Sequence, residues 1–133
     1  MMLTTELRID KPWGYEIILS PAQAQATAKI LHLKAGCRFS LQYHEIKEET
    51  LTLFQGKAKI IWGKDENNLN EEEMQPSLGY FIPRGLIHRV CAITDCDIFE
   101  SSTPEKGTTV RLQDDYHRGN EAEGEREKTR NSK

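Results

Sequence analysis

Short apolar segments separated by turn-forming residues constrain the fold of this chain more than any other feature. Eight such segments, each four to seven residues long, cover residues 13–19, 27–33, 39–44, 50–54, 58–62, 78–82, 88–93 and 97–100. Most are bounded by Gly, Pro, Asp or Asn, as β-strands are. Residues 57–62 alternate with period two, which places Ala58, Ile60 and Trp62 on one face of a predicted strand.

The segments between these strands favour turns over helices. Gln55 and Gly56 separate two strands and predict a hairpin turn. Residues 64–75 are polar and acidic, which indicates a solvated loop, and only residues 22–28 have a helical composition. Regularly spaced short strands with almost no helix predict an all-β sandwich or barrel.

Length and charge limit the class of protein. A chain of 133 residues is the size of one domain, and its net charge of −3 gives no support to nonspecific nucleic-acid binding. No apolar run is long enough to span a membrane, and the N-terminus shows no signal peptide. Three cysteines without a C-x-x-C pair suit a reducing compartment, so we expect a cytoplasmic protein.

The last fifteen residues differ in composition from the rest of the chain. Residues 119–133 contain one apolar residue, four Glu and four Lys or Arg. Such a segment buries too little apolar surface to offset its ordering entropy. We therefore predict a folded domain over residues 1–118 and a charged, flexible tail over residues 119–133.

Four polar side chains on or beside predicted strands could form a metal site. Gln42 and His44 are two residues apart on one strand, so their side chains leave the same face. Glu49 follows across a short bend, and His88 follows a Pro-Gly turn. Two imidazoles, a carboxylate and an amide oxygen suit a divalent transition metal, if hairpin geometry brings them together.

The spacing of these residues resembles the two motifs of the cupin superfamily. The first motif is G-x5-H-x-H-x(3–4)-E-x6-G, and the second is centred on P-x-G-x2-H. The residues in register are Gly36, His44, Glu49, Gly56, Pro83, Gly85 and His88, while Gln42 stands where the first His usually lies. The resemblance implies a single-domain cupin, a double-stranded β-helix with a jelly-roll-like barrel, and a homodimer.

Among cupins, the chain looks like the type II mannose-6-phosphate isomerase domain. The similar segments are KPWG at 11–14, SLQYH at 40–44, IPRGLIHR at 82–89 and RLQDDYHR at 111–118. This resemblance implies the metal ligands Gln42, His44, Glu49 and His88. The implied metal is zinc in the first place, with manganese, cobalt, nickel and iron as alternatives.

The function that this resemblance implies is a metal-dependent aldose–ketose isomerase acting on a sugar phosphate. Its catalytic residues would be Lys47, Arg111 and Asp115. Cations for the phosphate could come from Lys47, Arg84, Arg89 or Arg111, and the base could be Glu49, Glu45 or Asp115.

The chain departs from the family pattern near the expected metal. Lys47 stands where the family has Arg, Thr50-Leu51 replace a His-Trp pair, and His117 replaces a Gly. These departures leave an alternative open: a non-catalytic metal-binding cupin that binds a sugar or regulates a partner.

Overall fold

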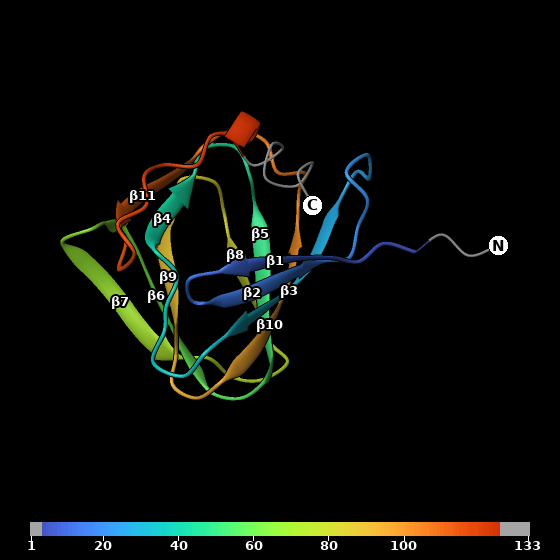
Figure 1. Ribbon diagram of the computed structural model, residues 1–133. Coiled ribbons are helices and arrows are strands. Elements are labelled where there is room, and N and C mark those ends of the chain that lie inside the picture. Colours follow the sequence, from blue (N-terminus) through green and yellow to red (C-terminus); the bar gives the residue numbers. More distant parts are fainter. Residues whose placement is uncertain (1–3, 126–133) are drawn as a thin grey trace.

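The computed structural model describes residues 4–125 and consists of two antiparallel β-sheets that face each other (Figure 1). The six-stranded sheet has the order β1 (Leu7–Lys11), β2 (Gly14–Ile18), β3 (Thr27–Leu33), β10 (Cys96–Ser102), β5 (Glu49–Gln55) and β8 (Gly79–Ile82). The five-stranded sheet has the order β11 (Thr109–Gln113), β4 (Leu41–His44), β9 (Ile87–Ala92), β6 (Ala58–Asp65) and β7 (Asn68–Glu73). This architecture confirms the predicted all-β jelly-roll-like barrel.

The core lies between the two sheets and follows the period-two pattern of the strands. Ala58 and Ile60 are buried on one face of β6, as predicted, and Trp62 packs partly buried against the same cluster. Trp13 is buried too, with its ring edge-on to Phe39 at a centroid distance of 4.6 Å. The apolar alternation thus fixes which face of each interior strand points inward.

Every one of the eight predicted strands overlaps an observed strand, but three strands were not predicted. These are β1, β7 and β11, and each lies at the edge of its sheet. Strand β7 falls within the predicted loop 64–75, and almost all of its side chains are exposed. An edge strand of this kind can be polar on both faces, so it carries no apolar alternation. Residues 22–28 have a helical composition but form no helix: residues 22–26 are turns and bends, and β3 begins at Thr27.

The predicted hairpin at Gln55 and Gly56 was also wrong. The turn joins β5 of the six-stranded sheet to β6 of the five-stranded sheet, so it carries the chain across the barrel. Gly56 has a φ of +85°, and a Cβ atom at this position would lie 2.2 Å from the carbonyl oxygen of Asp95. The close approach of the β9–β10 turn therefore requires a glycine here.

The folded domain continues beyond the predicted boundary at Arg118. The backbone N–H of Thr109 donates to the carbonyl of Glu121 at 2.9 Å, and the N–H of Glu121 donates back to Thr109 at 3.0 Å. Backbone pairing to the edge strand β11, rather than apolar burial, thus orders the start of the predicted tail. The rest of that prediction, residues 126–133, lies outside the described residues. Within residues 4–125, no helix has the length and apolar character that crossing a membrane would require.

Candidate metal centre and cavity

Three of the predicted ligands meet inside the barrel. His44 ends β4, Glu49 begins β5 and His88 lies on β9, and one ligand atom of each falls within 4.8 Å of the others. Glu49 Oε1 is 3.1 Å from His88 Nε2 and 3.5 Å from His44 Nε2. All three side chains are buried, so strands from both sheets contribute to one enclosed cluster.

Each imidazole uses its Nδ1 atom for a hydrogen bond outside the cluster, so its Nε2 atom faces Glu49 inside the cluster. His88 Nδ1 lies 2.9 Å from the carbonyl of Leu86, and a carbonyl only accepts, so Nδ1 carries a proton. In the neutral ring, His88 Nε2 is then an acceptor that faces another acceptor, Glu49 Oε1. His44 Nδ1 contacts the hydroxyl of Thr109 at 2.9 Å, while the buried His44 Nε2 has no hydrogen-bond partner. An imidazole N–H that donates to Glu49, or a divalent metal shared by the three side chains, would each satisfy these atoms. Two imidazoles and one carboxylate are a ligand set that fits a divalent metal.

The electrostatics of the cluster favour the forms that bind metal. Burial lowers the pKa of His44 to about 4, which keeps this imidazole neutral near pH 7. Burial alone would raise the pKa of Glu49, but Lys47 and the two histidines outweigh it and hold that pKa well below its usual range. A neutral His44 and an ionised Glu49 are the forms of these two side chains that coordinate a divalent metal.

Gln42, the fourth predicted ligand, lies beside this cluster. It is the cross-strand partner of His88 in the pairing of β4 with β9, and it lines the same cavity. Its Oε1 accepts a hydrogen bond from the hydroxyl of Ser40 at 2.6 Å. The structure thus places an amide oxygen on the strand that carries His44, two residues away.

Lys47 lies behind Glu49, inside the protein. Its ammonium is 3.1 Å from Glu49 Oε2, 3.1 Å from Glu100 Oε2 and 3.5 Å from Glu105 Oε1. Burial lowers the pKa of Lys47, but these three glutamates outweigh it and hold that pKa well above its usual value. The ammonium thereby holds Glu49 Oε2 and leaves Oε1 directed at the histidines.

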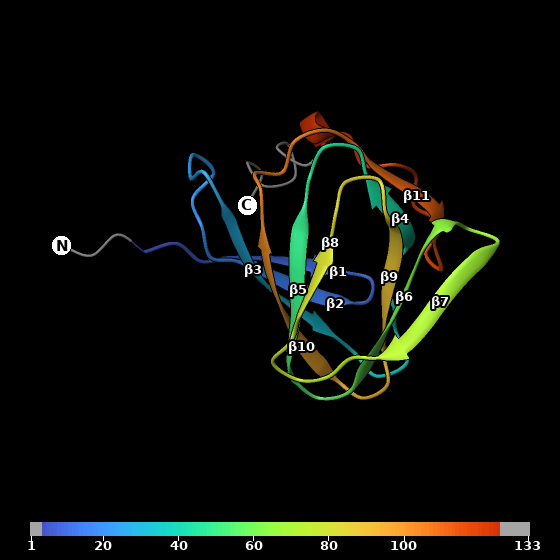
Figure 2. The same ribbon diagram turned by 180° about the vertical axis from the view of Figure 1, so that it is seen from behind.

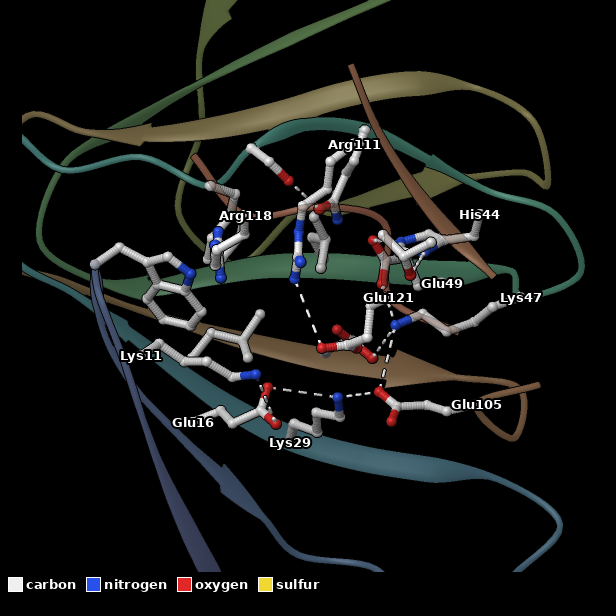
Figure 3. Close-up of a pocket in the computed structure, with 18 residues that line it drawn as sticks. Lys11, Glu16, Lys29, His44, Lys47, Glu49, Glu105, Arg111, Arg118 and Glu121 are labelled. Carbon is white, nitrogen blue, oxygen red and sulfur yellow. Dashed lines mark hydrogen bonds and ion pairs between the residues drawn. The ribbon is translucent and has the colours of Figure 1, made fainter. Parts of the chain in front are cut away.

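His44 and Glu49 of this cluster line a cavity of about 80 Å³ whose walls carry charges of both signs (Figure 3). Its cationic residues are Lys11, Lys29, Lys47, Arg111 and Arg118, and its acidic residues are Glu16, Glu49, Glu100, Glu105 and Glu121. Lys29 is buried against Glu105 and lies 3.5 Å from Glu16. Such walls can hydrogen-bond a small polar ligand on several sides.

Several residues predicted for the site do not reach this cavity. Asp115 is exposed and binds Arg38 through two hydrogen bonds of 2.7 and 2.8 Å. Glu45 and Arg84 are exposed, and neither lines the cavity. Arg89 is buried, but its Nε donates to the carbonyl of Phe39 at 3.0 Å, away from the cavity. Arg111 does line the cavity, so its role as a cation for the phosphate stays a prediction.

Glu16, Lys29 and Glu100 also line the cavity, and none of them was predicted from the sequence. Each occupies an inward-facing position two residues from a buried apolar residue of its strand: Ile18, Leu31 and Ile98, respectively. A charged residue at an inward position of a strand with apolar alternation was the signal that could have identified them. Charged residues are rarely buried without a charged partner, so each one indicates a second charge nearby in the fold.

The two facing sheets and the enclosed His-Glu-His cluster define the chain as a cupin. The family model described as mannose-6-phosphate isomerase C-terminal matches residues 2–100, and the chain belongs to that family. Among curated proteins, none matches this sequence significantly.

Solved structures share the fold at low sequence identity. The capsular polysaccharide assembling protein CapF from Staphylococcus aureus is 14% identical with a TM-score of 0.65, over 89% of this chain and 31% of CapF. KdgF from Halomonas sp. is 16% identical with a TM-score of 0.63, over 74% of this chain and 88% of KdgF. A deletion mutant of Bacillus subtilis oxalate decarboxylase OxdC is 16% identical with a TM-score of 0.68, over 80% of this chain and 30% of that protein. The chain thus spans about a third of CapF and of the decarboxylase.

Proposed function

We propose that this chain is a metal-dependent aldose–ketose isomerase that acts on a sugar phosphate. One observation carries the proposal: one ligand atom each of His44, Glu49 and His88 lies within 4.8 Å of the others, and His44 and Glu49 line a cavity that also holds cationic side chains. Membership of the mannose-6-phosphate isomerase C-terminal family supports a substrate of this class. A phosphate group binds cationic side chains, and sugar hydroxyls bind hydrogen-bond donors and acceptors. The cavity wall carries side chains of all these kinds.

The metal would be held by Gln42, His44, Glu49 and His88, with zinc in the first place and manganese, cobalt, nickel or iron as alternatives. A bound divalent metal polarises the carbonyl and hydroxyl oxygens between which an isomerase moves a proton. Thr109 and the carbonyl of Leu86 orient the two imidazoles through their Nδ1 atoms. Orienting contacts of this kind raise metal affinity.

Isomerisation transfers a proton between C1 and C2 of the sugar, so a base within reach of the cavity must accept and return this proton. Of the three carboxylates that the sequence suggested, Glu49 lines the cavity, whereas Glu45 and Asp115 do not. We therefore assign the base to the cavity carboxylates, with Glu49 first. Lys47 would act through Glu49 as a positioning residue.

A second function has a specific observation in its favour. Lys47 stands where the family has Arg, and three buried glutamates already surround its ammonium. A cation engaged in this way is a poor ligand for a substrate phosphate. A metal-binding cupin that binds a sugar or regulates a partner without catalysis would keep such an arrangement.

Elemental analysis and a substrate panel test the proposal. The purified chain should contain about one divalent metal per protomer. After loading with zinc, manganese or cobalt, it should interconvert mannose 6-phosphate and fructose 6-phosphate in a coupled assay. Pentose phosphates and unphosphorylated mannose complete the panel. Bound metal with no turnover of any sugar phosphate would contradict the isomerase and support the non-catalytic cupin.

A further inference from the structure

The cationic residues of the cavity differ in how fully their charges are compensated. Lys47 has three carboxylates within 3.5 Å, and Lys29 lies between Glu16 and Glu105. Arg118 binds Asp114 through two hydrogen bonds, of 2.8 Å from Nε and 3.1 Å from Nη2. These three cations thus hold close carboxylate partners from the chain itself.

Arg111 is compensated far less well. Its side chain is only 11% exposed, yet the nearest carboxylate oxygen within residues 4–125, Glu121 Oε2, is 3.6 Å from Nη2, beyond hydrogen-bond range. Nη1 donates to the carbonyl of Gly119 at 2.7 Å, and the buried Nε has no hydrogen-bond partner. Burial and the neighbouring charge of Arg118 lower the pKa of Arg111, and Glu121 opposes this. A buried guanidinium with an unused donor is a costly arrangement, which a better anion would relieve.

The segment that carries Glu121 pairs with the edge strand β11. An isolated bridge joins Glu121 to Thr109, and the side chain of Asn120 accepts from the backbone N–H of Arg111 at 2.9 Å. The carboxylate of Glu121 reaches from this segment across to Arg111 in the cavity (Figure 3). It therefore occupies the position that an anionic ligand of Arg111 would take.

We propose that Arg111 is the anion-binding group of the cavity, and that the carboxylate of Glu121 fills its place until a phosphate group displaces it. The planar fork of a guanidinium matches two phosphate oxygens, and the unused Nε is part of that fork. Lys29 and Lys47 are already saturated by glutamates, so they compete weakly for the incoming anion. This inference rests on the proposed function for the identity of the sugar, but the anion site can be tested with phosphate alone.

Calorimetric titration of the full-length chain with inorganic phosphate tests the inference. Glu121→Gln removes the competing charge but keeps the backbone bridge, so phosphate should bind about three- to tenfold more tightly. Arg111→Gln should weaken phosphate binding by about tenfold or more. Glu123→Gln is the matched control, because it makes the same charge change in the same segment at a residue that does not line the cavity. Metal content and thermal melting are measured for every variant.

Mannose 6-phosphate and unphosphorylated mannose form two further arms of the titration. Only the phosphorylated sugar should respond to Glu121→Gln, which separates recognition of the phosphate from recognition of the sugar. An unchanged phosphate affinity in Glu121→Gln would overturn the inference. Equal tightening by Glu121→Gln and Glu123→Gln would overturn it too, because it would reveal a general charge effect. Phosphate binding without turnover would instead contradict only the isomerase.

Discussion

At the scale of single residues, the position of Lys47 changes its expected role. The sequence suggested that Lys47 is a catalytic residue and a cation for the substrate phosphate. The structure buries the ammonium among Glu49, Glu100 and Glu105, on the side of Glu49 away from the histidines. Lys47 therefore acts on the metal centre through the carboxylate that it orients. Replacing it should disturb metal binding, besides any effect on substrate.

Lys47→Met tests this role, because methionine keeps much of the side-chain volume without the charge. Glu49 and Glu100 would lose the ammonium 3.1 Å away, and Glu105 would keep only Lys29, so the free energy of unfolding should fall by about 3–5 kcal/mol. Zinc affinity should fall about 10- to 100-fold, since Glu49 would no longer be oriented. Chemical denaturation and metal titration measure the two effects. Lys59→Met is the control: its ion pair with Glu71 is exposed, so both quantities should change little. Unchanged zinc affinity in Lys47→Met would show that Lys47 does not position Glu49.

The histidine assignment yields a second test at this scale. His88→Ala should lose most of the bound divalent metal and melt at a lower temperature than the metal-loaded wild type, because metal affinity adds to folding stability. His32→Ala is the matched control. His32 also lies on a strand, but it stacks on Tyr15 and contacts Asp97, outside the metal cluster. Metal analysis and thermal melting of both variants are the measurements, and full metal content in His88→Ala would refute the site.

At the scale of elements, the sequence predicted interior strands well and edges poorly. Interior strands bury one face, so their apolar residues alternate, and the segments around β3, β5 and β9 were correct to within a few residues. The polar edge strand β7 had no such pattern, and the turn at Gly56 could not reveal which sheet each neighbouring strand joins. Pairing partners depend on contacts between distant segments, which local alternation does not encode.

The close packing of the turn at Gly56 can be tested by comparing the stability cost of an alanine there with the cost at a matched glycine. Gly56 and Gly85 have similar φ angles, +85° and +81°, but only Gly56 faces backbone atoms, whereas a Cβ at Gly85 meets nothing within 4 Å. Gly85→Ala should cost about 1–2 kcal/mol of unfolding free energy, from the left-handed backbone alone. Gly56→Ala should cost at least about 1–3 kcal/mol more, because the β9–β10 turn must move away. Denaturation of the metal-free variants gives both values, and equal losses would contradict the close packing of this turn.

At the scale of the whole molecule, the fold unites charged residues that the sequence keeps far apart. The cavity wall includes four charged residues from different strands and loops: Glu16, Lys29, Lys47 and Glu100. They lie close together because the six-stranded sheet brings β2, β3, β5 and β10 side by side. Motif spacing identified the ligands on β4, β5 and β9. It could not identify this buried network, whose members follow no local spacing.

The outer face of the same sheet carries the last prediction. Ile17, Ile30 and Phe99 are direct cross-strand neighbours on β2, β3 and β10, they point away from the core, and all three are partly exposed. Strand β8 lies beside β5 at the sheet edge (Figure 2), where Phe81 is 59% exposed. On β5, which lies between β10 and β8, the neighbours of Phe99 and Phe81 are Thr52 and Thr50, so threonines separate the two aromatic side chains. A row of exposed apolar side chains on an outer sheet face is a candidate surface for another chain to cover, and stable dimers bury roughly 800 Å² per partner.

We therefore expect the chain to form a homodimer through this face. Analytical ultracentrifugation should give the mass of a dimer for the wild type. Phe99→Lys places a charge in the centre of the apolar row, so it should raise the dissociation constant of the dimer by about 100-fold or more while leaving bound metal unchanged, since the side chain faces away from the cavity. Ile93→Lys is the matched control: Ile93 is 49% exposed, but it follows β9 in the other sheet, and its substitution should leave the dimer intact. A monomeric wild type, or a Phe99→Lys variant that dimerises as the wild type does, would contradict this interface.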